Sequence, residues 1–215
     1  MNTGTEFDRK AHWEKVYQTK QTPEVSWYQD VPKTSLELIE QLNLKKSARI
    51  FDNGGGDSFL ADHLHKLGYE NITVQDISET ALERAKKRLG KDGDKIKWVV
   101  ADEAHCNPDQ QYDVWHDRAA FHFLTDEKEI ENYKRTIRDC IKPGGYLIIA
   151  TFSEQGPKKC SGLNIRQYSE DSLMDLLIDS FEKDKCFRVD HVTPANAVQN
   201  FVFCVFRRTA REPQS

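Results

Sequence analysis

Three consecutive glycines, residues 54–56, interrupt the stretch "IFDNGGGDSFLADHL" between an apolar run and a helix-like run. Glycine weakens the interior of a helix or a strand, because it has more backbone freedom to lose than any other residue. A triple glycine therefore indicates either a simple turn or a place where the backbone closely approaches a bound molecule. The surrounding sequence has to decide between these two interpretations.

Short apolar runs alternate with amphipathic runs through most of the chain. Strands are predicted at 48–54, 71–76, 95–102, 111–117 and 146–152, and helices at 33–42, 57–67, 79–90 and 127–141. This alternation is typical of an α/β fold with a parallel sheet covered by helices on both faces. After a loop at 153–169, the sequence predicts a helix over about 170–181 and an antiparallel hairpin of strands 187–194 and 199–208.

One domain over residues 1–215 is expected, because the length suits a single α/β domain and no internal repeat is present. The predicted core covers 46–208, and 209–215 is a polar tail expected to be loose. Residues 1–45 are polar but carry Trp13, Tyr17, Trp27 and Tyr28. Because aromatic side chains mark burial or a binding surface, we predict that this N-terminal arm and its helix fold back over the core as a lid.

Composition limits the partners and the compartment. The formal net charge of −4 does not favour bulk attraction to nucleic acid or to an anionic membrane, and no apolar run is long enough to cross a membrane. The five cysteines are widely spaced, with no CxxC pair, so neither a disulfide framework nor a metal site is expected and a reducing compartment is favoured. The polar N-terminus lacks a secretory signal, so the expected location is the cytoplasm.

Carboxylates follow the first three predicted strands. Asp52 ends the first strand, Asp76 ends the second, and Asp102 with Glu103 follow the third. Ligands of open α/β sheets bind at the carboxyl ends of the strands. Glycines there would admit a ligand, an acid after the second strand could accept from two ribose hydroxyls, and an acid after the third could accept from an adenine amine. Polar strand ends and turning glycines are common singly, but their combination in this order favours a nucleoside site.

The type of nucleoside is narrowed by two phosphate-binding motifs that the glycine loop lacks. The dinucleotide fingerprint GxGxxG would need glycine where Phe59 or Leu60 stands, and no GxxxxGK[ST] phosphate loop is present. Asp52 directly at the loop would repel a phosphate and favour a cationic ligand. S-adenosylmethionine, which carries an ammonium and a sulfonium, fits this pattern.

With these residues the sequence resembles the class I S-adenosylmethionine-dependent methyltransferases from about residue 11 to 208. Asp52, Gly54 and Gly56 match the first motif, Asp76 the ribose-binding acid, Asp102 the adenine-contacting acid, and 143–145 (Pro-Gly-Gly) the turn before the fifth strand. The resemblance implies a Rossmann-like three-layer αβα sandwich with a seven-stranded, mostly parallel sheet, ordered 3-2-1-4-5-7-6 with strand 7 antiparallel. More narrowly, the chain looks like a bacterial group that carries "YDVWHDRAxFHFLT" after the fourth strand.

The resemblance also implies a cofactor site and its product, S-adenosylhomocysteine. The implied cofactor-binding residues are Asp52, Gly54, Gly55, Gly56, Asp76, Ile77, Asp102, Glu103, His116 and Trp27. Two positions depart from the first motif: Ser58 replaces a common third glycine, and polar Asn53 stands where an apolar residue is usual. We expect neither to abolish binding, because Gly54 and Gly56 carry the close approach.

Candidate catalytic residues follow the fourth strand. Methyl transfer from a sulfonium mainly needs alignment of the reactants, so no catalytic triad is required and none is found. His116 is the candidate base or acceptor-orienting group, with Asp117 beside it; the alternative is a histidine that only hydrogen-bonds to the backbone at a strand end. Asp117 and Arg118 could pair with each other or bind a polar group of the acceptor.

The acceptor pocket is expected to use Tyr28, Arg118 and Arg166, with Trp27 and Tyr28 as a lid or merely as anchors of the arm. We predict a small-molecule acceptor and a monomer or weak dimer. The N-terminal "HWEKVY…VSWY" is similar to seven-strand methyltransferases that modify protein lysines, but 116–119 (His-Asp-Arg-Ala) replaces their Asp-Lys-Gly-Thr type stretch. A protein-lysine acceptor and a non-catalytic cofactor-binding module therefore stay as alternatives.

Overall fold

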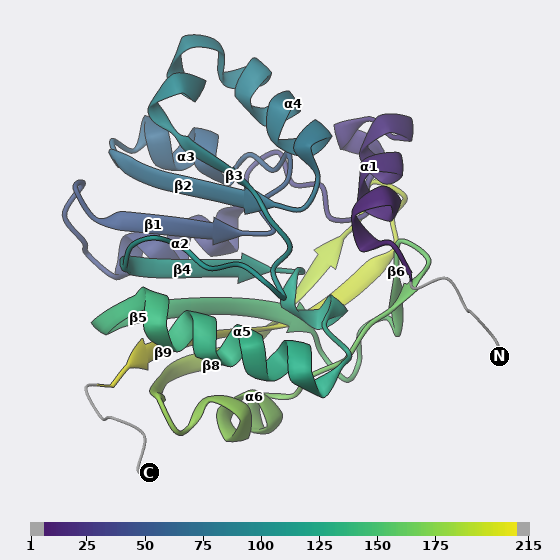
Figure 1. Ribbon diagram of the computed structural model, residues 1–215. Helices are drawn as coiled ribbons and strands as arrows, with labels where there is room; N and C mark the ends of the chain where they lie inside the picture. Colours follow the sequence, from purple (N-terminus) through teal and green to yellow (C-terminus); the bar gives the residue numbers. More distant parts are fainter. Residues whose placement is uncertain (1–6, 210–215) are drawn as a thin grey trace, which may run out of the picture.

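A seven-stranded sheet forms the centre of the molecule in the computed structural model, which describes residues 7–209 (Figure 1). The strands are β1 Arg49–Asn53, β2 Asn71–Asp76, β3 Lys97–Val100, β4 Tyr112–Arg118, β5 Ile141–Phe152, β8 Phe181–Val192 and β9 Val198–Arg208. Their order is β3-β2-β1-β4-β5-β9-β8, with β1 to β5 parallel and β9 antiparallel to both of its neighbours. The predicted order is therefore confirmed, since the short strands β6 and β7 lie outside this sheet.

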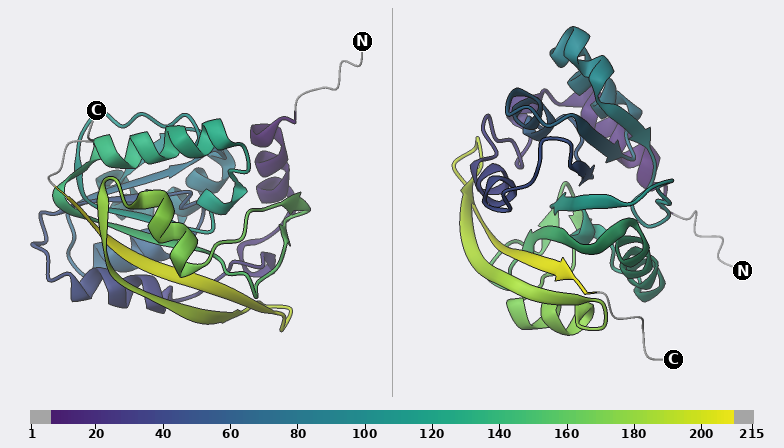
Figure 2. Two further views of the ribbon diagram at one scale, coloured as in Figure 1. Left: turned by 90° about the horizontal axis from the view of Figure 1, so that it is seen from below. Right: turned by 90° about the vertical axis from the view of Figure 1, so that its left-hand side faces the viewer.

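Helices cover both faces of the sheet and complete three layers (Figure 2). On one face lie α2 Lys33–Gln41, α3 Leu60–Lys66 and α4 Glu79–Leu89; on the other lie α5 Glu127–Cys140 and α6 Glu170–Leu177. Each face has its own apolar core: Ile39 and Leu64 pack against the first face, and Ile130 and Leu173 against the second. The three-layer αβα prediction is confirmed.

The first helix, α1 Arg9–Thr19, is absent from the sequence prediction. Its apolar residues do not form a regular stripe, so the usual helical period gives no signal. Asp8 nevertheless caps it, because its carboxylate accepts from the backbone N–H of Ala11 at 2.9 Å. Figure 1 shows α1 beside the ends of β1 and β4, where the sequence places the site.

Several element boundaries differ from the prediction. The helix expected over about 170–181 ends at Leu177, and β8 begins at Phe181 rather than at 187. The first half of β8 is polar, which hid it from the pattern, but an edge strand tolerates charged side chains because one side faces solvent. The predicted loop 153–169 contains a small hairpin of β6 Lys159–Cys160 and β7 Leu163–Asn164.

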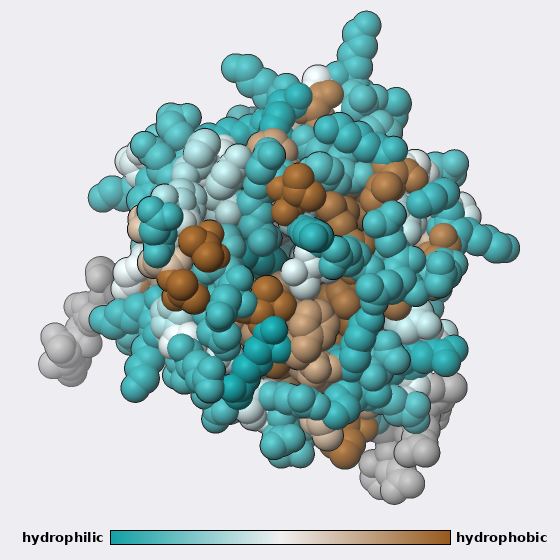
Figure 3. Space-filling view, turned by 180° about the vertical axis from the view of Figure 1, so that it is seen from behind, coloured by the Kyte–Doolittle hydropathy of each residue, from teal (hydrophilic) through white to brown (hydrophobic). Residues whose placement is uncertain are grey.

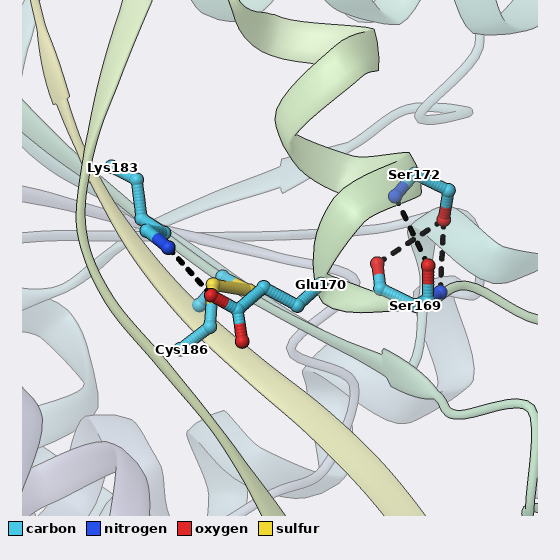
Figure 4. Close-up of a disulfide and its surroundings, with 6 residues drawn as sticks. Ser169, Glu170, Ser172, Lys183 and Cys186 are labelled. Carbon is cyan, nitrogen blue, oxygen red and sulfur yellow. Dashed lines mark hydrogen bonds and ion pairs between the residues drawn. A yellow bond between two sulfur atoms is a disulfide. The ribbon is translucent and has the colours of Figure 1, made fainter.

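A disulfide joins Cys186 to Cys204 and corrects the prediction that the cysteines stay unpaired (Figure 4). The two residues face each other across β8 and β9, with their Cα atoms 4.2 Å apart. They are 18 residues apart in the sequence, so only strand pairing reveals the contact. Because a disulfide is rare in a reducing cytosol, the argument from cysteine spacing to a reducing compartment no longer holds.

Apolar side chains on the face turned away in Figure 1 form small, separate patches among polar ones (Figure 3). Among residues 7–209, no helix is both long and apolar enough to cross a membrane. Within the same residues, no group of three or more histidine, cysteine or acidic side chains is arranged to hold a metal ion. Of the predicted tail, only Thr209 lies within the described residues, and its backbone N–H donates to Ser180 at 3.0 Å.

Candidate functional site

The glycine loop follows β1 and contains two left-handed residues. Gly54 and Gly56 have φ angles of +62° and +51°, a region that side chains rarely adopt. A Cβ at Gly54 would also overlap the Cβ of Ala120, and one at Gly56 would overlap the hydroxyl of Tyr17. Gly55 has an ordinary φ, but a Cβ there would lie 2.5 Å from Oδ2 of Asp52. Each of the three positions thus excludes a side chain for its own steric reason.

Asp52, at the base of this loop, is held by a buried histidine. Its Oδ1 accepts from Nδ1 of His116 at 2.7 Å, and Nε2 of His116 lies 2.8 Å from the hydroxyl of Ser35 on α2. All three side chains are buried. Oδ2 of Asp52 is also buried and has no hydrogen-bond partner among the described residues. The loop therefore presents one free carboxylate oxygen, which suits a cationic donor.

Both ring nitrogens of His116 are thus engaged within the protein. The prediction that His116 acts as a base gains no support from this arrangement, because neither nitrogen is free to take a proton from an acceptor. What the contacts support is a positioning role, in which His116 fixes the orientation of Asp52.

Asp117 accepts hydrogen bonds from several residues of the core and does not pair with Arg118. Neighbouring residues of a strand point to opposite faces, and Asp117 points into the core that lies under α5. There its Oδ2 accepts from Asn53 Nδ2 and from the Tyr133 hydroxyl, both at 2.8 Å, and its Oδ1 accepts from the backbone N–H of Phe121 at 3.1 Å. These bonds account for Asn53, a polar residue at a position where an apolar one is usual. Asp117 lines neither of the cavities described below.

A cavity of about 60 Å³ lies at the carboxyl ends of β2, β3 and β4. Asp76, Ile77 and Glu103 line one end of it. Burial raises the pKa of Asp76 to about 7 and that of Glu103 to about 8, since a charge is costly away from water. The negative charge of neighbouring carboxylates raises both pKa values further. The cavity thus holds two acids that accept hydrogen bonds once they are ionised.

Asp102, the predicted adenine-contacting acid, turns away from this cavity. Its carboxylate pairs with Arg9 of α1 at 2.8 Å, and the same guanidinium binds Glu129 of α5 at 2.7 Å. The acid that faces the cavity after β3 is Glu103. Spacing along the sequence could not separate two adjacent acids, because the turn after β3 decides which one points inward.

The N-terminal arm closes over the cavity. Trp13, Tyr17 and Trp27 line it, with the ring of Trp27 5.8 Å from that of Trp13 and 6.0 Å from that of Tyr17. Besides the Arg9 ion pairs, the carboxylate of Glu14 accepts from the backbone N–H of Glu79 at the start of α4, at 2.6 Å. These contacts hold the arm against the core, and its role as a lid stays a prediction.

A second cavity, of about 50 Å³, lies beside the glycine loop. Asp52, Gly55, His116 and Tyr28 line it, and it shares Trp27, Gly54 and Arg118 with the first cavity. The two are therefore compartments of one site. Small-molecule pockets commonly enclose roughly 300 Å³ or more, so a nucleoside-sized ligand needs the arm to move outward.

The far end of the first cavity is mostly apolar. Phe123, Phe152, Phe201, Cys160 and Gln199 line it, contributed by the loop after β4 and by β5, β6 and β9. Burial raises the pKa of the Cys160 thiol, so this side chain stays protonated and is a poor nucleophile. Phe201 and Gln199 carry no local motif, and only the antiparallel pairing of β9 brings them to the site.

Arg166, a predicted acceptor residue, lines neither cavity. Its guanidinium binds Glu127 at 2.6 Å, and its side chain is 40% exposed. Arg118, in contrast, reaches both cavities. Ser35, Tyr17 and Phe201 are site residues that the sequence analysis did not assign.

A family model described as "Methyltransferase domain" matches residues 50–145, which include β1 to β4 and the glycine loop. Among curated proteins, the chain is 31% identical over 129 residues to the eEF1A lysine and N-terminal methyltransferase of Mus musculus. That match covers 58% of this chain and 18% of the mouse protein. It is 26% identical to the Drosophila melanogaster homologue, over 92% of this chain and 28% of that protein. The chain spans less than a third of either relative.

Solved structures show the same fold. The 1,6-didemethyltoxoflavin-N1-methyltransferase of Burkholderia thailandensis, determined with S-adenosylhomocysteine and 1,6-didemethyltoxoflavin, matches with a TM-score of 0.70 and 18% identity. The match covers 93% of this chain and 87% of that one. These matches show the fold of the chain and a methyltransferase domain over residues 50–145.

Proposed function

We propose that the chain is a class I S-adenosylmethionine-dependent methyltransferase, which transfers the cofactor's methyl group to a small molecule bound beneath the N-terminal arm. The observation that carries this proposal is the site itself. A glycine loop with a free carboxylate oxygen and two buried acids lies at one edge of the sheet, next to an apolar chamber. These are the groups that a charged nucleoside and a methyl acceptor would need.

Each end of the cofactor has residues that fit it. The carboxylate of Asp76 can accept from ribose hydroxyls and that of Glu103 from an adenine amine, while Oδ2 of Asp52 can accept from the ammonium. The face of Trp27, between the two cavities, suits a sulfonium. When bound, S-adenosylmethionine supplies an electrophilic methyl group on a good leaving group.

The contribution of the chain to the reaction is then alignment and exclusion of water. Trp13, Tyr17 and Trp27 close the chamber, and the buried phenylalanines of β5 and β9 form its far wall. Neither His116, which is engaged at both nitrogens, nor the Cys160 thiol, which stays protonated, offers a base to an acceptor at the apolar end. An acceptor whose nucleophilic atom already carries a free lone pair suits such a site.

Methylation of a protein side chain is the second candidate, because the mammalian and insect relatives are named as eEF1A methyltransferases. The enclosed chamber favours a small acceptor instead. The two candidates are separated by incubating the protein with cell lysate and S-adenosylmethionine that carries a radiolabelled methyl group. Radioactivity in the small-molecule fraction supports the first proposal, and radioactivity in protein bands supports the second.

Cofactor binding is tested by calorimetry with S-adenosylmethionine and S-adenosylhomocysteine. We expect both to bind with affinities between micromolar and millimolar. Asp76→Ala should weaken binding at least about tenfold, because two charge-assisted hydrogen bonds are lost. Asp94→Ala, an exposed acid in the turn after α4, is the matched control and should bind as the wild type does. Absence of binding by the wild type would refute the proposal. Binding with no turnover in any lysate would leave a non-catalytic cofactor-binding module.

A further inference from the structure

Arg118, the last residue of β4, has a buried guanidinium without an acidic partner. Nη1 donates to the carbonyl oxygen of Trp27 at 3.2 Å. Nε and Nη2 are buried and have no hydrogen-bond partner among residues 7–209, and within that range Arg118 forms no ion pair. Burial lowers the pKa of Arg118 to about 10, so the group stays charged at neutral pH. An unpaired buried charge is strongly destabilising, so a partner from outside the chain is implied.

Among residues 7–209, no acidic side chain lies within ion-pair distance of Arg118. Its Cζ lies 5.0 Å from the centre of the Phe201 ring, so the guanidinium stacks on an apolar wall. His122 and His191 lie nearby, and burial together with the charge of Arg118 lowers the pKa of each, that of His122 to about 3. Both imidazoles are therefore neutral at physiological pH. Asp52, the acid that acts on Arg118, is already bound to His116.

Arg118 lies at the apolar end of the first cavity, where we propose that the methyl acceptor binds, so its unpaired nitrogens Nε and Nη2 are at that end. The guanidinium lies against β9, and Gln199 of β9 adds a second polar group to the same chamber. Asp76 and Glu103, which suit the nucleoside, line the other end. Ala119, the next residue, adopts a φ of +64°, a costly left-handed conformation for alanine that is often found at functional sites.

On the basis of the proposed function, we propose that Arg118 binds a carboxylate of the methyl acceptor, so that the acceptor is a small, partly apolar carboxylic acid. The two free nitrogens of a guanidinium match the two oxygens of a carboxylate in geometry and charge. The apolar walls from Phe152 and Phe201 suit the remainder of such an acid. A lysine ammonium in the same chamber would be repelled by Arg118, so the protein-lysine alternative is disfavoured on electrostatic grounds.

The methionine tail of the cofactor also ends in a carboxylate, and Arg118 lines the second cavity as well. The two sources can be separated with 5′-methylthioadenosine, which lacks the amino-acid tail. If Arg118 held the cofactor, Arg118→Gln would weaken S-adenosylhomocysteine binding more than tenfold and leave 5′-methylthioadenosine binding unchanged. We expect both affinities to stay within about threefold of wild type, well below the tenfold of one lost charged hydrogen bond. The former result would overturn the proposal.

The direct test uses acids and their neutral isosteres. Benzoate, phenylacetate and indole-3-acetate are each titrated into the S-adenosylhomocysteine complex beside the corresponding amide, with binding followed by tryptophan fluorescence. We expect at least one acid to bind more than about tenfold tighter than its amide, and Arg118→Gln to abolish that preference. Arg138→Gln, a partly exposed arginine of α5 paired with Asp139, is the matched control and should keep the preference.

Equal binding of acids and amides, no binding of any acid at millimolar concentration, or an acid preference that survives in Arg118→Gln would each overturn the proposal. Failure of the wild type to bind S-adenosylhomocysteine would instead refute the proposed function.

Folding provides an independent readout. Because Arg118→Met removes an unpaired buried charge, it should melt at a higher temperature than the wild type without ligand. A lower melting temperature would show that Arg118 serves the fold.

Discussion

His116 donates a hydrogen bond of 2.7 Å to Oδ1 of Asp52, and this contact turns the other carboxylate oxygen toward the glycine loop. The residue that the sequence singled out as a base thus supports Asp52, the acid that we propose binds the cofactor. Ser35 of α2 completes the chain of contacts at 2.8 Å. This imidazole therefore links α2 to the acid at the base of the glycine loop.

His116→Gln tests this role. Because glutamine can still donate to Asp52, we expect an increase of roughly tenfold in the KM for S-adenosylmethionine, with a smaller change in kcat and the same limbs in the pH–rate profile. A base would give a different pattern, since loss of general-base catalysis typically lowers kcat 10²–10⁴-fold. Disappearance of one limb of the profile together with such a drop would assign His116 to catalysis.

The glycine loop can be tested with a series of alanine substitutions. Gly90 combines a φ of +58° with a ψ of −128°, and a Cβ added there would meet no atom within 4 Å, so Gly90→Ala measures backbone strain alone, about 1–3 kcal/mol. Gly54→Ala adds a clash with Ala120, whose short side chain cannot move aside. We therefore expect Gly54→Ala to lower the free energy of unfolding in urea clearly more than Gly90→Ala. Equal losses would show that the loop is not crowded.

The raised pKa values of Asp76 and Glu103 predict that the free energy of unfolding decreases as the pH rises. Their folded pKa values are about 7 and about 8, against ordinary values of 3.8 and 4.5. The folded protein therefore binds more protons than the unfolded chain between about pH 4 and pH 8. Since the free energy of unfolding decreases with pH where the folded state holds the extra protons, these groups destabilise the protein progressively over this window.

Asp76→Asn isolates this effect, because asparagine keeps the shape and never ionises. For Asp76 alone the difference of about three pKa units corresponds to at most about 4 kcal/mol. In chemical denaturation without ligand, the variant should be more stable than the wild type at about pH 8, and the difference should shrink as the pH falls toward about 4. It should also bind S-adenosylhomocysteine more weakly. A stability difference that does not change with pH would contradict the assignment.

The disulfide is checked by counting thiols. After unfolding without reductant, three of the five cysteines should react with an alkylating reagent, namely Cys106, Cys140 and Cys160. A reductant should expose all five and lower the free energy of unfolding by about 3 kcal/mol, because the bond closes a loop of about 18 residues. In Cys186→Ala the reductant should have no further effect. Five reactive thiols in the protein isolated without reductant would refute the pairing.

Local sequence patterns were sufficient for most of the fold. The alternation of strands and helices, the capping of α4 by Ser78 and the position of the glycine loop all depend on neighbouring residues and on periods of two or 3.6. The helix α1 lacks such a period and was not predicted. The polar first half of β8 was not predicted either, because its residues show no strand pattern and pairing with β9 is what holds them in a strand.

The sequence by itself determined the sheet order and the acids at the strand ends. Parallel strands bring their carboxyl ends to one edge wherever the individual side chains turn. The tertiary structure decided which of those side chains act together. It turned Asp102 toward Arg9 and Glu103 toward the cavity, buried Asp117 with Asn53 and paired Cys186 with Cys204. Within the described part of the chain, it also left Arg118 without an ion pair. Contacts between residues far apart in the chain depend on packing, and spacing along the sequence does not encode the direction in which a side chain points.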